Sequence, residues 1–122
     1  MKNFKEHPNK LYLVVEVNKT IVGHLDLSSD HKKRMQHNGE FGIGILKAFW
    51  GEGLGSILMT EMLEFAINNK VLRKINLMVS VKNENAIRLY KKFGFEEEGR
   101  IREDIYVNGA YNDGFWMGRL LQ

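Results

Sequence analysis

Cysteine is absent from this chain of 122 residues, and proline occurs once, at position 8. Without cysteine the chain has no disulfide, no thiolate metal ligand and no cysteine nucleophile, so any group transfer must be direct or use another side chain. Long hydrophobic runs are also missing, because the longest, residues 11–15, is far short of the roughly 18 residues of a membrane helix. The first eight residues lack the apolar stretch of a signal peptide. We therefore expect a cytoplasmic protein that does not enter a membrane.

A large excess of one charge is lacking too. Eighteen lysines and arginines oppose 15 acidic residues, which gives a formal net charge of +3. This balance is typical of a solvated surface and suits a small anionic ligand. The basic run Lys32 to Arg34 leaves nucleic-acid binding as a minor alternative, so we expect no nucleic-acid partner. No metal site is expected either, because no two histidines have the spacing of a ligand pair on a helix (His7, His24, His31 and His37).

The length and the hydrophobic fraction of 43% predict one globular domain over residues 1–122. Alternation of apolar residues and β-branched composition predict strands, and helical spacing of apolar residues predicts helices. Hairpin turns are indicated at Asn18 to Thr20 and at Asn108-Gly109. Gly94 is typical of a helix end, and the polar stretch 28–39 is typical of a solvated loop. The expected strands are 11–17, 21–27, 41–45, 74–81, 95–107 and 113–120, and the expected helices are 54–69 and 83–93.

This order of elements predicts an α/β or α+β domain with a mixed sheet. The strand, helix and strand between residues 41 and 81 should form a parallel, right-handed unit. Gly42 and Gly44 fall on the same face of their strand and leave it without side chains. Because glycine weakens a strand unless a bulge or a close partner needs the space, we expect something to lie against that face.

A glycine-rich segment, Trp50 to Ser56, joins the third strand to the first helix. Glycines at such a junction let backbone N–H groups turn inward, where they and the positive helix end hold phosphate oxygens. The segment is not a nucleoside-triphosphate loop, because no Gly-Lys-Ser/Thr follows. It also fails the dinucleotide pattern, because Ser56 stands where the third glycine belongs.

Three motifs in this order resemble those of the GCN5-related N-acetyltransferases, the GNAT superfamily, over about 80 residues. They are Gly-x-Gly-x-Gly at 51–55, Asn-Glu-Asn-Ala-Ile-Arg-Leu-Tyr at 83–90 and Lys-Lys-Phe-Gly-Phe at 91–95. Trp50 stands where the family usually has Gln or Arg, a departure from the family pattern. The run of an aromatic residue, Trp and Gly at 49–51 resembles the branch of ribosomal-protein N-terminal and polyamine acetyltransferases. The resemblance implies a mostly antiparallel sheet with a parallel core that binds the cofactor, and an activity that moves an acetyl group from acetyl-CoA to a primary amine.

The resemblance also implies which residues bind acetyl-CoA. Backbone groups of Ile43 and Ile45 would pair with the pantetheine arm as an added strand. Asn83 matches the asparagine that hydrogen-bonds the pantetheine region, and Tyr90 matches the tyrosine that points at the thioester sulfur. The pyrophosphate would be held by the backbone amides of one run of residues: Gly51, Glu52, Gly53, Leu54, Gly55 and Ser56.

For catalysis the resemblance gives Tyr90 as the acid that protonates the departing thiolate, while its place on the apolar stripe also allows a role as a core aromatic. Glu40 is our first choice of base, acting through water, and a surface carboxylate is its alternative role. Weaker candidates for the base are His24, Asp26 and Asp113.

Members of the superfamily begin with a strand and helices, and the resemblance implies that these are reduced or absent here, because only about ten residues precede the first expected strand. We therefore expect that a partner subunit, as in a homodimer, completes the pocket, unless the chain is truncated. The alternative function is a catalytically incomplete module that binds CoA or acyl-CoA.

Overall fold

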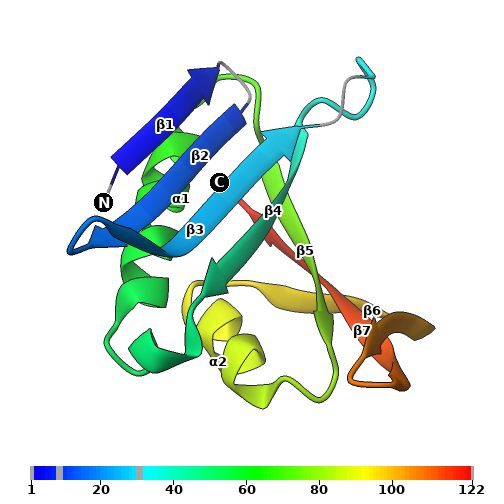
Figure 1. The fold of residues 1–122 in the computed structure, drawn as a ribbon. Coiled ribbons are helices and arrows are strands. Elements are labelled where there is room, and N and C mark those ends of the chain that lie inside the picture. The colour runs from blue at the N-terminus through cyan, green and yellow to red at the C-terminus, as the bar shows by residue number, and fades with distance from the viewer. Residues whose placement is uncertain (1, 8–9, 30–31, 122) are drawn as a thin grey trace.

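A computed structural model describes residues 2–7, 10–29 and 32–121 of the chain, and of residues 2–7 only the backbone. Its strands form one seven-stranded sheet in the order β1-β2-β3-β4-β5-β7-β6, and two helices pack against it (Figure 1). All neighbouring strands are antiparallel except β4 and β5. The mixed, mostly antiparallel sheet with one parallel pair is therefore as expected from the sequence.

The strands follow the hydrophobic patterns of the sequence closely. Two-residue turns with positive φ at both positions, Asn18-Lys19 and Asn108-Gly109, join the two expected hairpins, because this backbone matches the twist of the flanking strands. The strands are β1 (Lys2–His7), β2 (Lys10–Val17), β3 (Thr20–Ser29), β4 (Asn38–Ile45), β5 (Lys74–Ser80), β6 (Glu96–Val107) and β7 (Ala110–Leu120).

The two helices are α1 (Leu54–Asn68) and α2 (Glu84–Lys92), and a short 3-10 helix, η1 (Lys47–Phe49), precedes α1. Asn83 caps α2, because its side-chain oxygen accepts a hydrogen bond from the Ala86 N–H at 3.2 Å. Gly94, at φ +92°, ends α2 as the sequence predicts. The N–H groups of Gly94 and Phe95 bond to the Lys91 and Tyr90 carbonyls, which is the Schellman arrangement.

The core lies between α1 and one face of the sheet, which we call the helix-side face and define by Leu25, Phe41 and Leu77. Leu58, Met59, Met62 and Ala66 of α1 are fully buried against it. The opposite face, defined by His24, Glu40 and Asn76, carries the alternate residues of the same strands. Among the described residues no helix is long and apolar enough to cross a membrane.

Two segments differ from the sequence-based expectation. Residues 2–7, which no pattern assigned to an element, pair with β2 as the edge strand β1. The expected loop 28–39 is shorter, because β3 continues to Ser29 and pairs with Gly39 and Glu40 of β4. Polar side chains are tolerated there because backbone hydrogen bonds, which do not depend on the side chain, extend the ladder.

The parallel pair β4–β5 is short, and this shapes the centre of the molecule. Pairing extends only from Asn38 with Lys74 to Glu40 with Asn76. Beyond this point the two strands separate, and α2 lies at the open end between them (Figure 1). The separation leaves the second half of β4 without a strand on its β5 side.

Candidate functional site

The junction between η1 and α1 is a left-handed turn that only glycine adopts easily. Gly51 and Gly53 have φ values of +81° and +80°. A Cβ atom at either position would meet nothing within 4 Å, so the backbone conformation and not crowding requires glycine there. Gly53 is the N-cap of α1, has no side chain to cap the helix, and leaves the N–H groups of the first turn exposed for an anion.

Gly55, two residues further on, is required for a different reason. A Cβ atom at Gly55 would lie 3.2 Å from a methyl carbon of Leu89 in α2 and 3.7 Å from the Ile45 Cδ1. The glycine thus lets the start of α1 pack closely against α2 and the end of β4. No acidic residue lies in the first turn of α1 to repel an anion.

The alternation of hydrogen-bonded and non-bonded residue pairs between β3 and β4 decides which backbone groups of β4 are free. The Leu46 N–H bonds to the Val22 carbonyl at 2.8 Å. Bonded and non-bonded pairs alternate in an antiparallel ladder, and Gly23–Ile45 and Leu25–Ile43 are therefore non-bonded pairs. The backbone groups of Ile43 and Ile45 thus point away from β3, toward the gap, where no strand of the described chain pairs with them.

The free edge of β4, the glycine turn and the start of α2 enclose one cavity of about 670 Å³. Of the ten residues that the sequence assigned to acetyl-CoA, nine line it, and Glu52, which is exposed, does not. Lining residues that sequence reasoning missed include Phe49, Asn85, Ala86 and Leu89. The nine expected ones are Ile43, Ile45, Gly51, Gly53, Leu54, Gly55, Ser56, Asn83 and Tyr90.

Tyr90 lines this cavity and is only 8% exposed. Its ring packs edge-on against Phe41 of β4, with the centroids 5.8 Å apart, and against Phe95 at 6.3 Å. Burial raises the pKa of the Tyr90 hydroxyl above its ordinary value. Tyr90 is therefore both a core aromatic and a cavity residue, and its hydroxyl keeps its proton at neutral pH.

Asn83 lines the cavity while its side-chain oxygen caps α2. The carbonyl of this amide is thus engaged, which leaves the NH₂ group as the end that can donate to a ligand. Capping fixes the side chain at the helix start. Capping of α2 is thus a structural reason for an asparagine at position 83, and its free NH₂ group is the part that a ligand in the cavity would contact.

The face of Gly42 and Gly44 is not bare, and this corrects the explanation given from the sequence. A Cβ atom at Gly44 would lie 2.9 Å from the His24 Nε2, and one at Gly42 would lie 3.2 Å from the Asp26 Oδ1. The two glycines make room for cross-strand side chains of β3 on the opposite face. The edge of β4, and not this face, is what remains free for a ligand.

Trp50 holds the turn in place from outside. Its indole N–H donates to the Ile45 carbonyl at 2.7 Å. The residue is 60% exposed, and the Lys47 Nζ lies 6.0 Å from the centroid of its ring. Of the Ile45 backbone groups that face the gap, the carbonyl is therefore already bonded. Ile43 keeps both its groups available.

Glu40 does not line the 670 Å³ cavity. It lies on the opposite face, beside Asn76, in a second cavity of about 400 Å³. The neighbouring Phe41 side chain contacts Tyr90 on the helix-side face. Glu40 and Tyr90 thus approach the end of the β4–β5 pairing from the two sides of the sheet.

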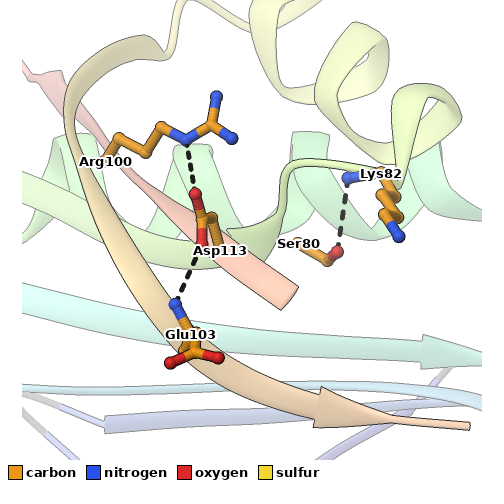
Figure 2. Close-up of polar contacts among 5 residues, drawn as sticks. All are labelled: Ser80, Lys82, Arg100, Glu103 and Asp113. Atoms are coloured by element: carbon orange, nitrogen blue, oxygen red, sulfur yellow. Dashed lines mark hydrogen bonds and ion pairs between the residues drawn. The ribbon is translucent and has the colours of Figure 1, made fainter. Parts of the chain in front are cut away.

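Asp113 of β7, a weaker candidate for the base, forms hydrogen bonds to residues of β6 instead (Figure 2). Its carboxylate accepts hydrogen bonds from the Glu103 N–H at 2.9 Å and the Arg100 Nε at 2.8 Å. The Glu103 N–H first, and Arg100 second, hold the pKa of Asp113 below its ordinary value. A carboxylate held in this way is a poor proton acceptor, and Figure 2 shows it binding the irregular part of β6.

No group of three or more His, Asp or Glu residues in the described part of the chain is arranged to hold a metal ion. His31 lies outside the described residues, and the side chain of His7 is not described.

Residues 1–95 match the family described as the acetyltransferase (GNAT) family. The chain belongs to the GNAT family. The GNAT resemblance drawn from the motifs at 51–55 and 83–95 is thereby confirmed.

Among GNAT relatives, an L-amino acid N-acetyltransferase of Escherichia coli K12 is 36% identical over 94% of this chain and 71% of its own length. A spermidine N(1)-acetyltransferase of Vibrio cholerae is 30% identical over 92% of this chain and 64% of its own length. The chain thus spans roughly two thirds of the length of these two relatives. A putative ribosomal N-acetyltransferase of Bacillus subtilis is also similar, at 28% identity over 71% of the chain and 48% of its own length.

The GNAT fold is equally clear in solved structures. A GNAT acetyltransferase of Streptococcus pneumoniae superposes with a TM-score of 0.90 at 34% identity, over 95% of this chain and 69% of that one. A Streptococcus mutans protein superposes with a TM-score of 0.82 at 30% identity, over 93% of this chain and 72% of that one.

Proposed function

We propose that the 670 Å³ cavity binds acetyl-CoA. The observation that carries this proposal is the combination of an unpaired β4 edge at Ile43 and Ile45 with the exposed N–H groups at the start of α1. An extended chain with amide groups suits the first, as an added strand. A diphosphate suits the second, because it offers negative oxygens to a positive helix end.

We further propose that the chain transfers the acetyl group to a primary amine. Acetyl-CoA supplies an electrophilic thioester carbonyl. The amine nitrogen forms a bond to the acetyl carbon and loses a proton, the carbon–sulfur bond breaks, and the thiolate takes up a proton to leave as the thiol. The backbone N–H of Ile43 supports negative charge on the carbonyl oxygen, an effect of about 3 kcal/mol in comparable sites.

Tyr90 is the proposed proton donor to the thiolate. It lines the cavity, and its raised pKa keeps the hydroxyl protonated until it is needed. Tyr90 regains its proton from solvent after each cycle. The ring contacts with Phe41 and Phe95 hold it in one orientation, so the donor does not have to be ordered during the reaction.

Glu40 is the proposed base. An alkylamine with a pKa near 10.4 is almost wholly protonated at pH 7, which costs about 4–5 kcal/mol if the free amine must be formed. Glu40 lies at the last β4–β5 pair, on the side of the sheet away from Tyr90. An amine that arrives from that side can pass its proton to this carboxylate through water.

Two named relatives act on different amines: one on L-amino acids and one on spermidine. Both substrate types present a primary amine, so the relatives support an amine acceptor for this chain without choosing between them. The test is a screen of L-amino acids, diamines and short peptides with release of the CoA thiol as the readout. Amine-dependent thiol release supports transfer, whereas CoA binding without release for any amine would leave a binding module.

A further inference from the structure

The second cavity, of about 400 Å³, lies on the opposite face of the sheet where β4 and β5 begin to separate. Polar side chains and one large aromatic line it, and its size suits a small molecule. None of these residues was assigned to acetyl-CoA. Its lining residues are Ser28, Ser29, Met35, Asn38, Gly39, Glu40, Lys74, Asn76 and Trp116.

Asn76 is the unusual member of this lining. It is only 7% exposed, and its amide oxygen has no hydrogen-bond partner among the described residues. Buried polar atoms in native proteins nearly always have a hydrogen-bond partner, so this oxygen in the cavity wall is an acceptor that the N–H donor of a bound molecule can satisfy. Asn76 is also the Cα partner of Glu40, which places both at the point where the strands separate.

The charges around Asn76 favour a cation. Glu40 is exposed and forms no ion pair with any described residue. Lys74, the cation of the lining, is neutralised by Glu98, with 2.7 Å between Nζ and Oε1. Gly118 makes room for this arrangement, because a Cβ atom there would lie 2.7 Å from a Glu98 carboxylate oxygen. A carboxylate on a ligand would have to displace Glu98 from Lys74.

We propose that this cavity binds the acceptor as an alkylammonium without a carboxylate, with Asn76 as the residue that binds the ammonium and the Lys74–Glu98 pair as the feature that disfavours a carboxylate. The Asn76 oxygen accepts an N–H of the ammonium, and the Glu40 carboxylate balances its charge. This inference rests on the proposed function, because it places the amine across the sheet from Tyr90. In this arrangement the ammonium gives one proton to Glu40, while a second N–H stays hydrogen-bonded to the Asn76 oxygen. The lone pair freed on the amine nitrogen then faces the gap between β4 and β5.

The test measures binding of 1,4-diaminobutane by calorimetry in the presence of saturating CoA, and compares Asn76→Leu with the unmodified chain. We expect at least tenfold weaker diamine binding, with CoA affinity changed less than twofold. Asn112→Leu is the matched control, because Asn112 is the other buried asparagine with an unpaired oxygen and does not line either cavity. It should leave diamine binding unchanged. Asn76→Ser, which is smaller and still polar, replaces the leucine variant if that one fails to fold, with the same result expected.

Specificity gives a second measurement. Glu98→Gln frees Lys74 for a carboxylate, so it should strengthen binding of an L-amino acid such as L-leucine several-fold without strengthening that of the diamine. The unmodified chain should bind the diamine at least tenfold more tightly than L-leucine. Tighter binding of L-leucine, or diamine binding that Asn76→Leu does not weaken, would overturn the inference.

Different results would refute the proposed use of this cavity and the proposed transfer reaction. Amine-dependent thiol release with an unchanged KM for the diamine in Asn76→Leu would refute this use of the cavity and leave the transfer reaction standing. Diamine binding that depends on Asn76, without thiol release, would support the cavity and refute the transfer.

Discussion

The indole nitrogen of Trp50 lies 2.7 Å from the carbonyl oxygen of Ile45 and donates a hydrogen bond to it. This bond spans η1 and ties the glycine turn to the end of β4, the two elements proposed to hold the two halves of CoA. Trp50 stands where the family usually has Gln or Arg. In this chain the side chain at that position fixes the glycine turn against the end of β4 through its hydrogen bond.

Replacing Trp50 by Phe removes this donor while keeping an aromatic ring. We expect CoA binding about two- to tenfold weaker, because a hydrogen bond of this kind contributes about 0.5–1.5 kcal/mol. Calorimetry with CoA measures it. Lys47→Ala, which removes only the cation beside the ring, should change affinity little. Equal binding by Trp50→Phe would show that the bond does not position the turn.

Gly53→Ala places a Cβ on a residue at φ +80°. We expect a loss of about 1–2 kcal/mol of stability or a shift of the turn, because non-glycine residues are strained there. CoA affinity should fall with it, since Gly53 caps the helix end that faces the cavity. Gly99→Ala is the control, because that site has open space and no positive φ. Thermal unfolding and CoA titration of both variants check the prediction.

Tyr90→Phe should lower kcat by about 100-fold and leave acetyl-CoA affinity within about twofold, because only the proton donor is lost. Steady-state thiol release with the best amine of the screen gives the first value, and calorimetry gives the second. Tyr106→Phe, at the exposed hairpin tip, should change neither. An unchanged kcat in Tyr90→Phe would remove the hydroxyl from the mechanism.

The raised pKa of Tyr90 also has a consequence for stability. The folded state holds this proton more tightly than the unfolded state, whose tyrosine has the ordinary value of 10.0. The stabilising contribution of the protonated Tyr90 to the folded state is thus fully present below pH 10.0, and it is lost as the pH rises through the higher pKa of the folded state. The difference in unfolding free energy between the unmodified chain and Tyr90→Phe, measured by urea titration at pH 8 to 11, should narrow above pH 10.0. A difference that grows with pH would contradict the direction of the shift.

Asp113→Asn tests the support of β6. The lowered pKa of Asp113 means that its stabilising contribution is present above the ordinary value of 3.8 and is lost as the pH falls through the folded value. The substitution should therefore destabilise the chain at pH 7 and much less near pH 3. Urea unfolding at both values, with Asp104→Asn as the control, measures this. A larger effect at pH 3 would show that the charge of Asp113 does not stabilise β6.

The sequence predicted most of the fold because local patterns agreed with the final packing. β-branched composition in 11–17, alternation in 74–81, helical spacing in 54–69, and the Asn-Gly and Gly94 signals each correspond to an element or end in the structure. β1 was missed because the sequence of residues 2–7 is mostly polar and shows no alternation of apolar residues.

The candidate site was predictable only where a motif marked it. The glycines at 51, 53 and 55 could be found because positive φ and close packing demand that residue type. Asn76 could not, because its role depends on where β4 and β5 stop pairing, which is set by tertiary structure. The purpose of Gly42 and Gly44 was misjudged for the same reason, since the sequence does not show that His24 and Asp26 cross over them.

The most direct test is a two-dimensional ¹H–¹⁵N NMR titration of the chain with CoA. Binding at the free β4 edge and the glycine turn should shift the amide signals of Ile43, Ile45 and Gly53 to Ser56 at submillimolar CoA. Signals of the hairpin tip at Asn108-Gly109 should stay in place. The absence of any shift at millimolar CoA in folded protein, or shifts confined to the opposite face at His24 and Asp26, would contradict CoA binding in this cavity.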